Sequence, residues 1–332
     1  METHYSAIAY AKINLHLSIG PKAEDGFHSI ASLFQSISLA DRISLALPDI
    51  QEGLEKEQGG RKVERGGQAE PDIVVEGEFD CLPESTTLYK AARLFLERQG
   101  IRSRLYIRVD KGIPAKAGLG GGSADAAALL VLLDKAFGTG LDQRELIDLG
   151  LSVGSDVPFF FKGGTAFVHG RGELIEVLPP IRDLGILLIC PSFGVSTGSA
   201  YAALDAWRAE KPIEGNSRPW DKTVPEEKKR QILDELGKPL DCWAFKNDFS
   251  PVLYREYPIY KPIEALLHSE GAAFVSVSGS GSSIFGLFES QENARQAKER
   301  LIGDGAEEST RKLLYGMALH AIKPLETSLR LG

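Results

Sequence analysis

The clearest chemical feature of the sequence is a glycine-rich stretch that begins at Lys111 and reads KGIPAKAGLGGGSADAAALL. A strand-like segment, 105–109, precedes it, and a run of alanine and leucine typical of a helix follows it. Glycines remove side chains where a backbone must come close to a ligand. The helix offers unpaired N–H groups and the positive end of its dipole, which together suit phosphates. The stretch therefore predicts a phosphate-binding loop.

Two common phosphate-binding patterns do not fit this loop. A Walker A loop needs Gly-Lys followed by Ser or Thr after the glycines, and the sequence has no such triplet there. A Rossmann loop needs a third glycine or alanine where, counting from Gly118 and Gly120, Ser123 stands. The loop therefore argues against P-loop ATPases and against dinucleotide-dependent oxidoreductases.

Two charged residues stand in otherwise apolar surroundings. Lys12 lies in the alternating segment 8–19, and Asp156 lies between a Gly-Ser turn and an apolar run, 157–160. Alone, the lysine would more often be a packed or paired side chain, and the aspartate could be a helix cap or a turn residue. Together they fit phosphoryl transfer, in which an aspartate accepts the hydroxyl proton and a lysine stabilises developing charge.

A second loop of small residues, SGSGSS at 278–283, connects two apolar segments, 274–277 and 284–288. It has two interpretations. It is either a hairpin exposed to solvent or a cover over a triphosphate, and the sequence alone does not choose between them.

The elements around these motifs mix helices and strands without strict alternation, which favours an α+β fold. The pattern predicts strands at 8–19, 30–47, 105–109, 165–168, 186–190, 274–277, 284–288 and, as the last one, 318–322. Helices are predicted at 87–99, 262–268, 293–301 and 124–137, the last with Ser123 as N-cap and Gly138 at its end. Asp142 and Glu145 form a plausible capping box for a further helix.

Length and composition exclude several classes of protein. A chain of 332 residues is long enough for two domains, and 43% hydrophobic with 25% charged residues is ordinary for a soluble protein. The net charge of −8 argues against nucleic acid as a partner. The start has no signal-peptide pattern and the apolar run 186–190 is too short to span a bilayer, so we expect a cytoplasmic protein without a membrane partner. The polar stretch 48–71 predicts a flexible surface insertion.

These stretches, in this order, resemble the GHMP kinase superfamily, named for its galactose, homoserine, mevalonate and phosphomevalonate kinases. Within it, the sequence is similar to a branch that carries A-K-I-N-L, a D-G-[YF]-H turn and a segment ending in L-F-Q, here at 11–15, 25–28 and 33–35. The branch also shares the glycine loop, G-x-D-V-P-F-F at 154–160, G-V-S-T at 194–197, N-D-F at 247–249 and the SGSGSS loop.

The resemblance implies a two-domain α+β fold with the active site in the cleft between the domains. Residues 1–178 would form the ATP-binding domain and residues 179–332 the C-terminal domain. The implied reaction is ATP-dependent phosphorylation of the 2-hydroxyl of a cytidine-diphosphate-linked methylerythritol, in the non-mevalonate route to isoprenoids. ATP brings Mg²⁺ with it, although no metal ligands can be named from the sequence. The oligomeric state also stays open.

The resemblance also implies roles for single residues. Lys12 and Asp156 match the catalytic pair, with Asp156 as the base. Asn14 lies beside the sugar alcohol, Phe27 stacks on the cytosine and His28 recognises it. The implied ATP contacts are Pro114, Ala115, Lys116, Ala117, Gly118, Leu119, Gly120, Gly121, Gly122, Ser123 and Ala124. Phe27 stands where the branch often has tyrosine, and Lys116 and Ala117 where some members have glycine.

Two alternatives remain at this point. A GHMP kinase for another alcohol, such as homoserine or mevalonate, would lack a cytosine-recognising turn, and the Phe27-His28 pair argues against it. A non-catalytic nucleotide-binding protein on the same fold would be expected to have lost Lys12 or Asp156, and both are present.

Overall fold

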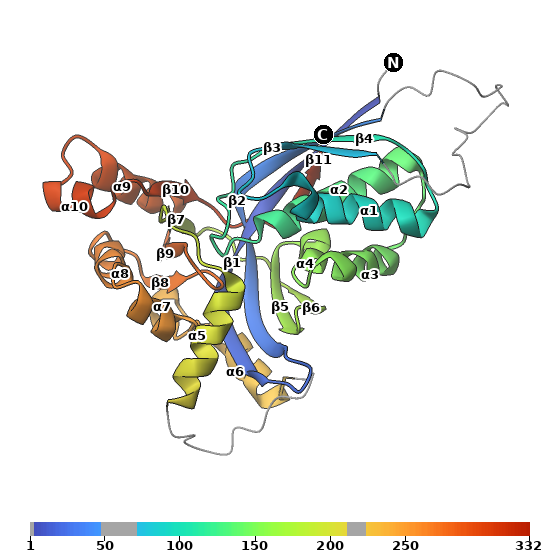
Figure 1. Ribbon diagram of the computed structural model, residues 1–332. Helices are drawn as coiled ribbons and strands as arrows, with labels where there is room; N and C mark the ends of the chain where they lie inside the picture. Colours follow the sequence, from blue (N-terminus) through green and yellow to red (C-terminus); the bar gives the residue numbers. More distant parts are fainter. Residues whose placement is uncertain (1–2, 48–71, 211–223) are drawn as a thin grey trace, which may run out of the picture.

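The computed structural model describes residues 3–47, 72–210 and 224–332. These residues form two lobes, each built on its own sheet (Figure 1). The insertion predicted at 48–71 lies outside the described residues, as does 211–223. In the part that is described, no helix combines the length and the apolar character needed to cross a bilayer.

The first lobe contains a seven-stranded sheet in which β11, β1, β2, β4 and β3 lie in that order, while β5 pairs with β2 and β6 with β5. All pairs are antiparallel except β3 with β4. The strands are β1 (Thr3–Lys22), β2 (His28–Leu47), β3 (Ile73–Gly77), β4 (Leu105–Asp110), β5 (Thr165–Gly170), β6 (Leu174–Leu178) and β11 (Leu329–Leu331).

Four helices pack beside this sheet: α1 (Thr87–Gln99), α2 (Gly121–Phe137), α3 (Gln143–Val153) and α4 (Val157–Lys162) (Figure 1). A 3₁₀ turn, η1 (Pro83–Ser85), precedes α1. Alanines at 124 and 126–128 are fully buried. Because their side chains are small, α2 can lie against both β1 and β2 and against α1. This packing fixes the N-terminus of α2 close to the middle of β1.

The second lobe contains a four-stranded antiparallel sheet in the order β10, β7, β9, β8. Its strands are β7 (Gly185–Cys190), β8 (Phe274–Val277), β9 (Ile284–Phe288) and β10 (Ala318–Ile322). Its other elements are α5 (Thr197–Ala209), α6 (Glu226–Leu236), η2 (Leu240–Cys242), α7 (Ser250–Glu256), α8 (Tyr260–Ser269), α9 (Gln291–Ile302) and α10 (Glu308–Leu313). In Figure 1, α5 runs alongside β1 between the two lobes.

A shift in register on β1 decides which side chains face the site. The pairing of β1 with β2 is interrupted between Asn14 and His16. Lys12 and Asn14 line one cavity, whereas His16 and Ser18 line a different one. An irregularity of this kind redirects the side chains that follow it. The strand thus presents polar groups to both of its faces.

Most of the elements predicted from the sequence are confirmed, with two corrections. The helix after the glycine loop begins at Gly121 with Gly120 as its N-cap, so the prediction of Ser123 as N-cap is wrong. Gly120 takes that position because its φ of 71° lies in the left-handed region, which glycine adopts freely. The end at Gly138 and the capping box of Asp142 and Glu145 are confirmed. Segment 318–322 is not the last strand, because β11 follows it.

The predicted domain division at residues 178 and 179 falls between β6 and β7, where the first sheet gives way to the second. It stays a prediction. The chain also crosses back, since β11 adds a strand to the first sheet beside β1.

Candidate active site

The predicted motifs meet at one cavity of about 580 Å³ between the two lobes. Its walls come from β1, the connection from β3 to α1, the glycine loop, the turn before α4, the start of α5 and the SGSGSS loop. All of the predicted site residues line it except Phe27, His28 and Ala124. Ala124 is fully buried and its N–H donates to the Gly120 carbonyl at 2.9 Å, so it faces the core of the lobe.

Lys12 lines this cavity and is almost completely buried, with 4% of its surface exposed. Its Nζ donates to Asn14 Oδ1 at 2.6 Å, lies 3.7 Å from Asp156 Oδ2, and sits 4.5 Å from the centre of the Phe34 ring. Burial lowers the pKa of Lys12 below its ordinary value, and the Asp156 carboxylate offsets part of that shift. The arrangement holds an ammonium group beside a carboxylate at the bottom of a cleft.

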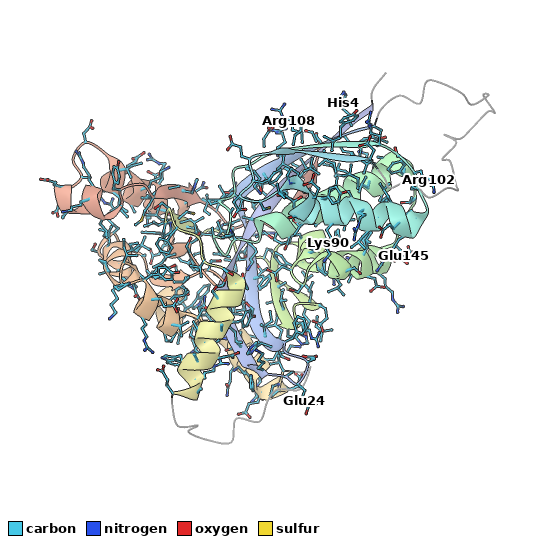
Figure 2. The ribbon with its side chains drawn as sticks, viewed as in Figure 1. His4, Glu24, Lys90, Arg102, Arg108 and Glu145 are labelled. Carbon is cyan, nitrogen blue, oxygen red and sulfur yellow. The ribbon has the colours of Figure 1, made fainter. Side chains whose placement is uncertain are left out.

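Asp156 stands directly before α4, at its N-cap position, but its side chain makes no capping hydrogen bond. The carboxylate points instead toward Lys12, with about a third of the side chain exposed (32%). The interpretation of Asp156 as only a helix cap is therefore wrong. Lys90 on α1 (Figure 2) helps to fix the end of α3, which precedes Asp156 in the chain. Its Nζ donates a hydrogen bond of 2.8 Å to the Val153 carbonyl at that end.

The backbone of the glycine loop makes hydrogen bonds with β1 and with the second lobe. The N–H of Lys12 donates to the Leu119 carbonyl at 3.0 Å, and Ser278 Oγ donates to the Gly118 carbonyl at 2.8 Å. Gly118 has a φ of 73°, and a Cβ placed there would lie 2.8 Å from the Gly281 carbonyl oxygen. Only glycine fits such a position.

The N-terminus of α2 opens onto the cavity. The N–H groups of Ser123 and Ala124 both donate to the Gly120 carbonyl. Because a helix has no earlier turn to satisfy its first donors, the N–H groups of Gly121 and Gly122 remain for a ligand. Both residues line the cavity, as does Ser123. This end of α2 therefore suits a phosphate group.

The SGSGSS loop joins β8 to β9 as a hairpin, but it is not exposed to solvent. The serines at 278, 280, 282 and 283 are all buried. The N–H of Ser283 donates to the Ala117 carbonyl at 3.1 Å, and Gly279 and Ser280 line the cavity. Of the two interpretations that the sequence left open, the solvent hairpin is wrong.

A buried charged cluster lies beneath the glycine loop. Lys111 Nζ donates to Asp41 Oδ2 at 2.5 Å and to Asp125 Oδ2 at 2.9 Å, and Asp41 Oδ1 accepts from the N–H groups of Gly112 and Ile113. Burial alone would lower the pKa of Lys111, but the two carboxylates together raise it. Burial raises the pKa of Asp125, and Lys111 opposes that shift. The cluster fixes the start of the loop and keeps a cation at the cavity wall.

The two residues of the predicted cytosine-recognising turn lie in different environments. Phe27 is exposed (58%), and the Arg171 guanidinium sits 4.5 Å from the centre of its ring. His28 is buried, shares a hydrogen bond of 2.9 Å between Nδ1 and the Gly20 carbonyl, and stacks on Tyr201 with ring centres 4.9 Å apart. Its Nε2 lies 3.3 Å from Asp205 Oδ1. The turn thus lies beside the cavity wall formed by Tyr201 and Arg171 rather than on that wall.

Sequence reasoning missed several side chains that line the cavity, among them Lys111, Arg171 and Tyr201. Lys111 opens the glycine-rich stretch, so the sequence itself showed that this lysine lies next to the loop. Tyr201 follows the G-V-S-T stretch by four residues, on a helix, α5, that was not predicted. Burial, with the nearby Asp156 carboxylate, raises the pKa of Tyr201 to about 12, so this side chain is a neutral phenol. Nothing in the sequence pointed to Arg171.

Comparison with known proteins shows which family this chain belongs to. The model of the GHMP kinases N terminal domain matches residues 86–164, and that of the GHMP kinases C terminal domain matches residues 229–306. The 4-diphosphocytidyl-2-C-methyl-D-erythritol kinase of Moorella thermoacetica is 37% identical over 294 residues, which cover 88% of this chain and 93% of that protein. The chain belongs to the GHMP kinases. The kinase of the same name from Treponema pallidum (strain Nichols) is also 37% identical, with the same coverage.

Solved structures agree with this family membership. A crystal structure of 4-(cytidine 5'-diphospho)-2C-methyl-D-erythritol kinase has a TM-score of 0.68 at 28% identity and covers 97% of this chain and 99% of that chain. Homoserine kinase from Cytophaga hutchinsonii, at 18% identity and a TM-score of 0.69, shares the fold and covers 99% of this chain and 97% of that chain. As a GHMP kinase, the chain is a small-molecule kinase that uses ATP, and the predicted two-domain α+β fold is confirmed.

Proposed function

We propose that this GHMP kinase transfers the γ-phosphoryl group of ATP to the 2-hydroxyl of 4-diphosphocytidyl-2-C-methyl-D-erythritol, a step toward isoprenoid precursors. The observation that carries the proposal is the Lys12–Asp156 pair, 3.7 Å apart, in the same cavity as the open N-terminus of α2. The names of the relatives at 37% identity support this substrate over other alcohols.

Asp156 is the proposed proton acceptor. As the hydroxyl oxygen forms its bond to the γ-phosphorus, the bond from that phosphorus to the β–γ bridging oxygen breaks, and its electron pair leaves with ADP. The hydroxyl proton passes to the Asp156 carboxylate. Lys12, held by Asn14 and Asp156, stabilises the charge that develops on the transferred group. Positioning and charge neutralisation supply most of the rate in such reactions.

The proposed ATP contacts are mainly backbone groups of the glycine loop. The N–H groups of Gly121 and Gly122 and the dipole of α2 would hold the phosphates, with Ser123 beside them. The SGSGSS loop covers the loop from the second lobe through the Ser278–Gly118 hydrogen bond. A cation also lies at this wall, because Lys111 lines the cavity. These features support ATP as the donor.

Mg²⁺ is proposed to enter with ATP. Across the described residues, no group of three or more His, Cys, Asp or Glu side chains could hold a metal ion, so the donor set does not fit a site built by the protein alone. It fits the usual arrangement in which one or two carboxylates and water share Mg²⁺ with substrate phosphates. Asp156 and Asp125 line the cavity, and Asp125 Oδ1 is buried with no hydrogen-bond partner. Bound there, Mg²⁺ would neutralise charge on the phosphates.

The acceptor end of the cavity is proposed to lie between β1 and α5. Asn14 stands next to Lys12 and would contact the sugar alcohol. Tyr201 offers an aromatic face, and His28 stacks behind it. Arg171 supplies a cation for the diphosphate and covers Phe27 from one side. We propose that Phe27 meets the cytosine with its exposed face. A cytoplasmic location stays a prediction from the sequence.

A coupled assay of ADP release tests this proposal with purified chain and Mg-ATP. The acceptors are 4-diphosphocytidyl-2-C-methyl-D-erythritol, homoserine and mevalonate. We expect turnover of the cytidyl substrate alone, and a loss of about 10²- to 10⁴-fold in kcat for Asp156→Asn. Turnover of another alcohol instead would refute the proposed acceptor.

Asp110→Asn is the matched control for the carboxylate. Asp110 lies on β4 and does not line the cavity. Its exposed carboxylate pairs with Arg108, which Figure 2 labels. The control should keep the unsubstituted activity. If Asp156→Asn keeps it as well, Asp156 is not the proton acceptor.

A further inference from the structure

One ion pair joins two separate walls at the nucleotide side of the cavity. Lys116 belongs to the glycine loop, and Asp80 belongs to the connection between β3 and η1. Lys116 Nζ lies 2.6 Å from Asp80 Oδ2, and both residues line the cavity. Both side chains are about half exposed, at 58% and 45%. The pair therefore lies at the mouth of the cavity and not in its depth.

The backbone of Lys116 is fixed although its side chain is exposed. Its φ of 52° lies in the left-handed region, which is unfavourable for a residue other than glycine. The Lys116 carbonyl accepts from the N–H of Val195 in the second lobe at 3.1 Å. A Cβ placed on Gly194 would lie only 2.7 Å from that of Lys116, so the stem of the lysine fills the space beside this glycine. The second lobe thus aims the side chain across the cavity mouth.

The charges of the pair are suited to an exchange of partners. The hydrogen bond to Asp80 raises the pKa of Lys116, and the same bond lowers the pKa of Asp80, so both groups are ionised. An exposed ion pair of this kind is weak, because water competes for both partners. A polyphosphate carries several negative charges and attracts the ammonium group more strongly than one carboxylate does.

We propose that Asp80 holds Lys116 across the mouth of the cavity and that Lys116 exchanges Asp80 for the phosphates when ATP enters. This proposal rests on the proposed function, since it takes the cavity to be the ATP site. Lys116 is then a phosphate-binding cation in addition to a backbone contact. Asp80 becomes a residue that weakens nucleotide binding, because its bond to Lys116 must break first and its charge is then left near the phosphates.

The test measures dissociation constants for ATP and for adenosine by titration calorimetry, without any acceptor. Asp80→Asn should bind ATP about two- to fivefold more tightly than the unsubstituted chain, and Lys116→Gln more weakly by a similar factor. Lys116→Arg, which keeps the charge, should restore most of the affinity. Adenosine has no phosphates, so its dissociation constant should change in none of these variants.

Two further arms make the outcome decisive. In the Lys116→Gln background, Asp80→Asn should gain less ATP affinity than it does alone, because the pair no longer exists to be broken. Glu97→Gln, which removes the acid of the exposed pair with Arg93 on α1, is the matched control and should leave ATP binding unchanged.

If Asp80→Asn weakens ATP binding as Lys116→Gln does, the ion pair only holds the two walls in place for ATP binding. That result would overturn the proposal. Equal effects on ATP and adenosine would overturn it too. If the unsubstituted chain binds no ATP at all, the proposed ATP site fails and the exchange with it. If it binds ATP normally while the two single variants behave alike, only the exchange fails.

Discussion

Replacement of Gly118 by alanine tests how closely the glycine loop and the SGSGSS loop approach each other. The best control is Gly138→Ala at the far end of α2. The two glycines have similar φ angles, 73° and 61°. They differ in surroundings, because a Cβ at Gly138 would meet nothing within 4 Å, whereas one at Gly118 would meet the carbonyl oxygens of Ser278 and Gly281.

The expected magnitudes follow from this difference. Alanine in the left-handed region costs about 1–2 kcal/mol, and this is the whole effect expected for Gly138→Ala. At Gly118, the Cβ would lie 2.8 Å from the Gly281 oxygen and 3.0 Å from the Ser278 carbonyl carbon. The Ser278 carbonyl oxygen would lie closer still, so the second loop must retreat by roughly 1–1.5 Å to restore ordinary van der Waals separation. Such overpacking adds about 1–3 kcal/mol to the loss of stability.

A displacement of about 1 Å at a site of this kind lowers the rate about 10²-fold. Urea unfolding and the ADP-release assay measure the two effects on the same preparations. We expect Gly118→Ala to lose more stability than Gly138→Ala and to lose activity, while Gly138→Ala keeps its activity. If the two variants match in both measurements, the close approach of the loops at Gly118 does not exist in solution.

Three further changes have expected outcomes. Lys12→Met should lower kcat by about 10²- to 10³-fold with little change in the KM for either substrate, as measured by initial rates of ADP release; a change confined to KM would remove Lys12 from the reaction step. Tyr201→Ala should raise the KM for the cytidyl substrate about 10-fold or more while Tyr201→Phe does not, and an equal rise in the KM for ATP would show that α5 does not form the acceptor wall. Burial lowers the pKa of His16 to about 3, so this histidine stays neutral in the folded chain, and stability is lost as the pH falls below about 6.5, where the unfolded chain takes up the proton. This loss should reach about 2 kcal/mol at pH 5 in urea unfolding. His16→Gln should flatten that slope, and an unchanged slope would contradict the burial of a neutral ring.

Much of the site could be predicted from local patterns. The glycine loop, Lys12 and Asp156 stood out because each breaks the pattern around it: four glycines at a helix start, a lysine on an apolar strand and an acid before an apolar run. The structure brings all three to one cavity. Strands and helices with clear periodicity were found because a regular pattern reflects burial on one face.

What could not be predicted depends on contacts between distant segments. The side-chain pattern favoured Ser123 as the N-cap, but Gly120 caps α2 because the loop turns through the left-handed region there. Arg171 lines the cavity only because the pairing of β5 with β2 brings the turn between β5 and β6 to the start of β2. His28 is buried because it stacks on Tyr201, which belongs to α5, a helix from the other lobe. No local pattern contains this information.

The return of the chain to β1 has a consequence for its synthesis. β11 pairs with β1 through Ala9 and Leu329, which lie roughly 320 positions apart. The N–H of Tyr10 donates to the Ser328 carbonyl at 2.9 Å, and Ser328 is fully buried. A ribosome makes β1 before the other described strands and β11 after them. The edge of β1 that pairs with β11 therefore stays unpaired while both lobes are being made. An unpaired strand edge is where a nascent chain tends to associate with other chains. The first sheet to appear on the ribosome is thus the last to be completed.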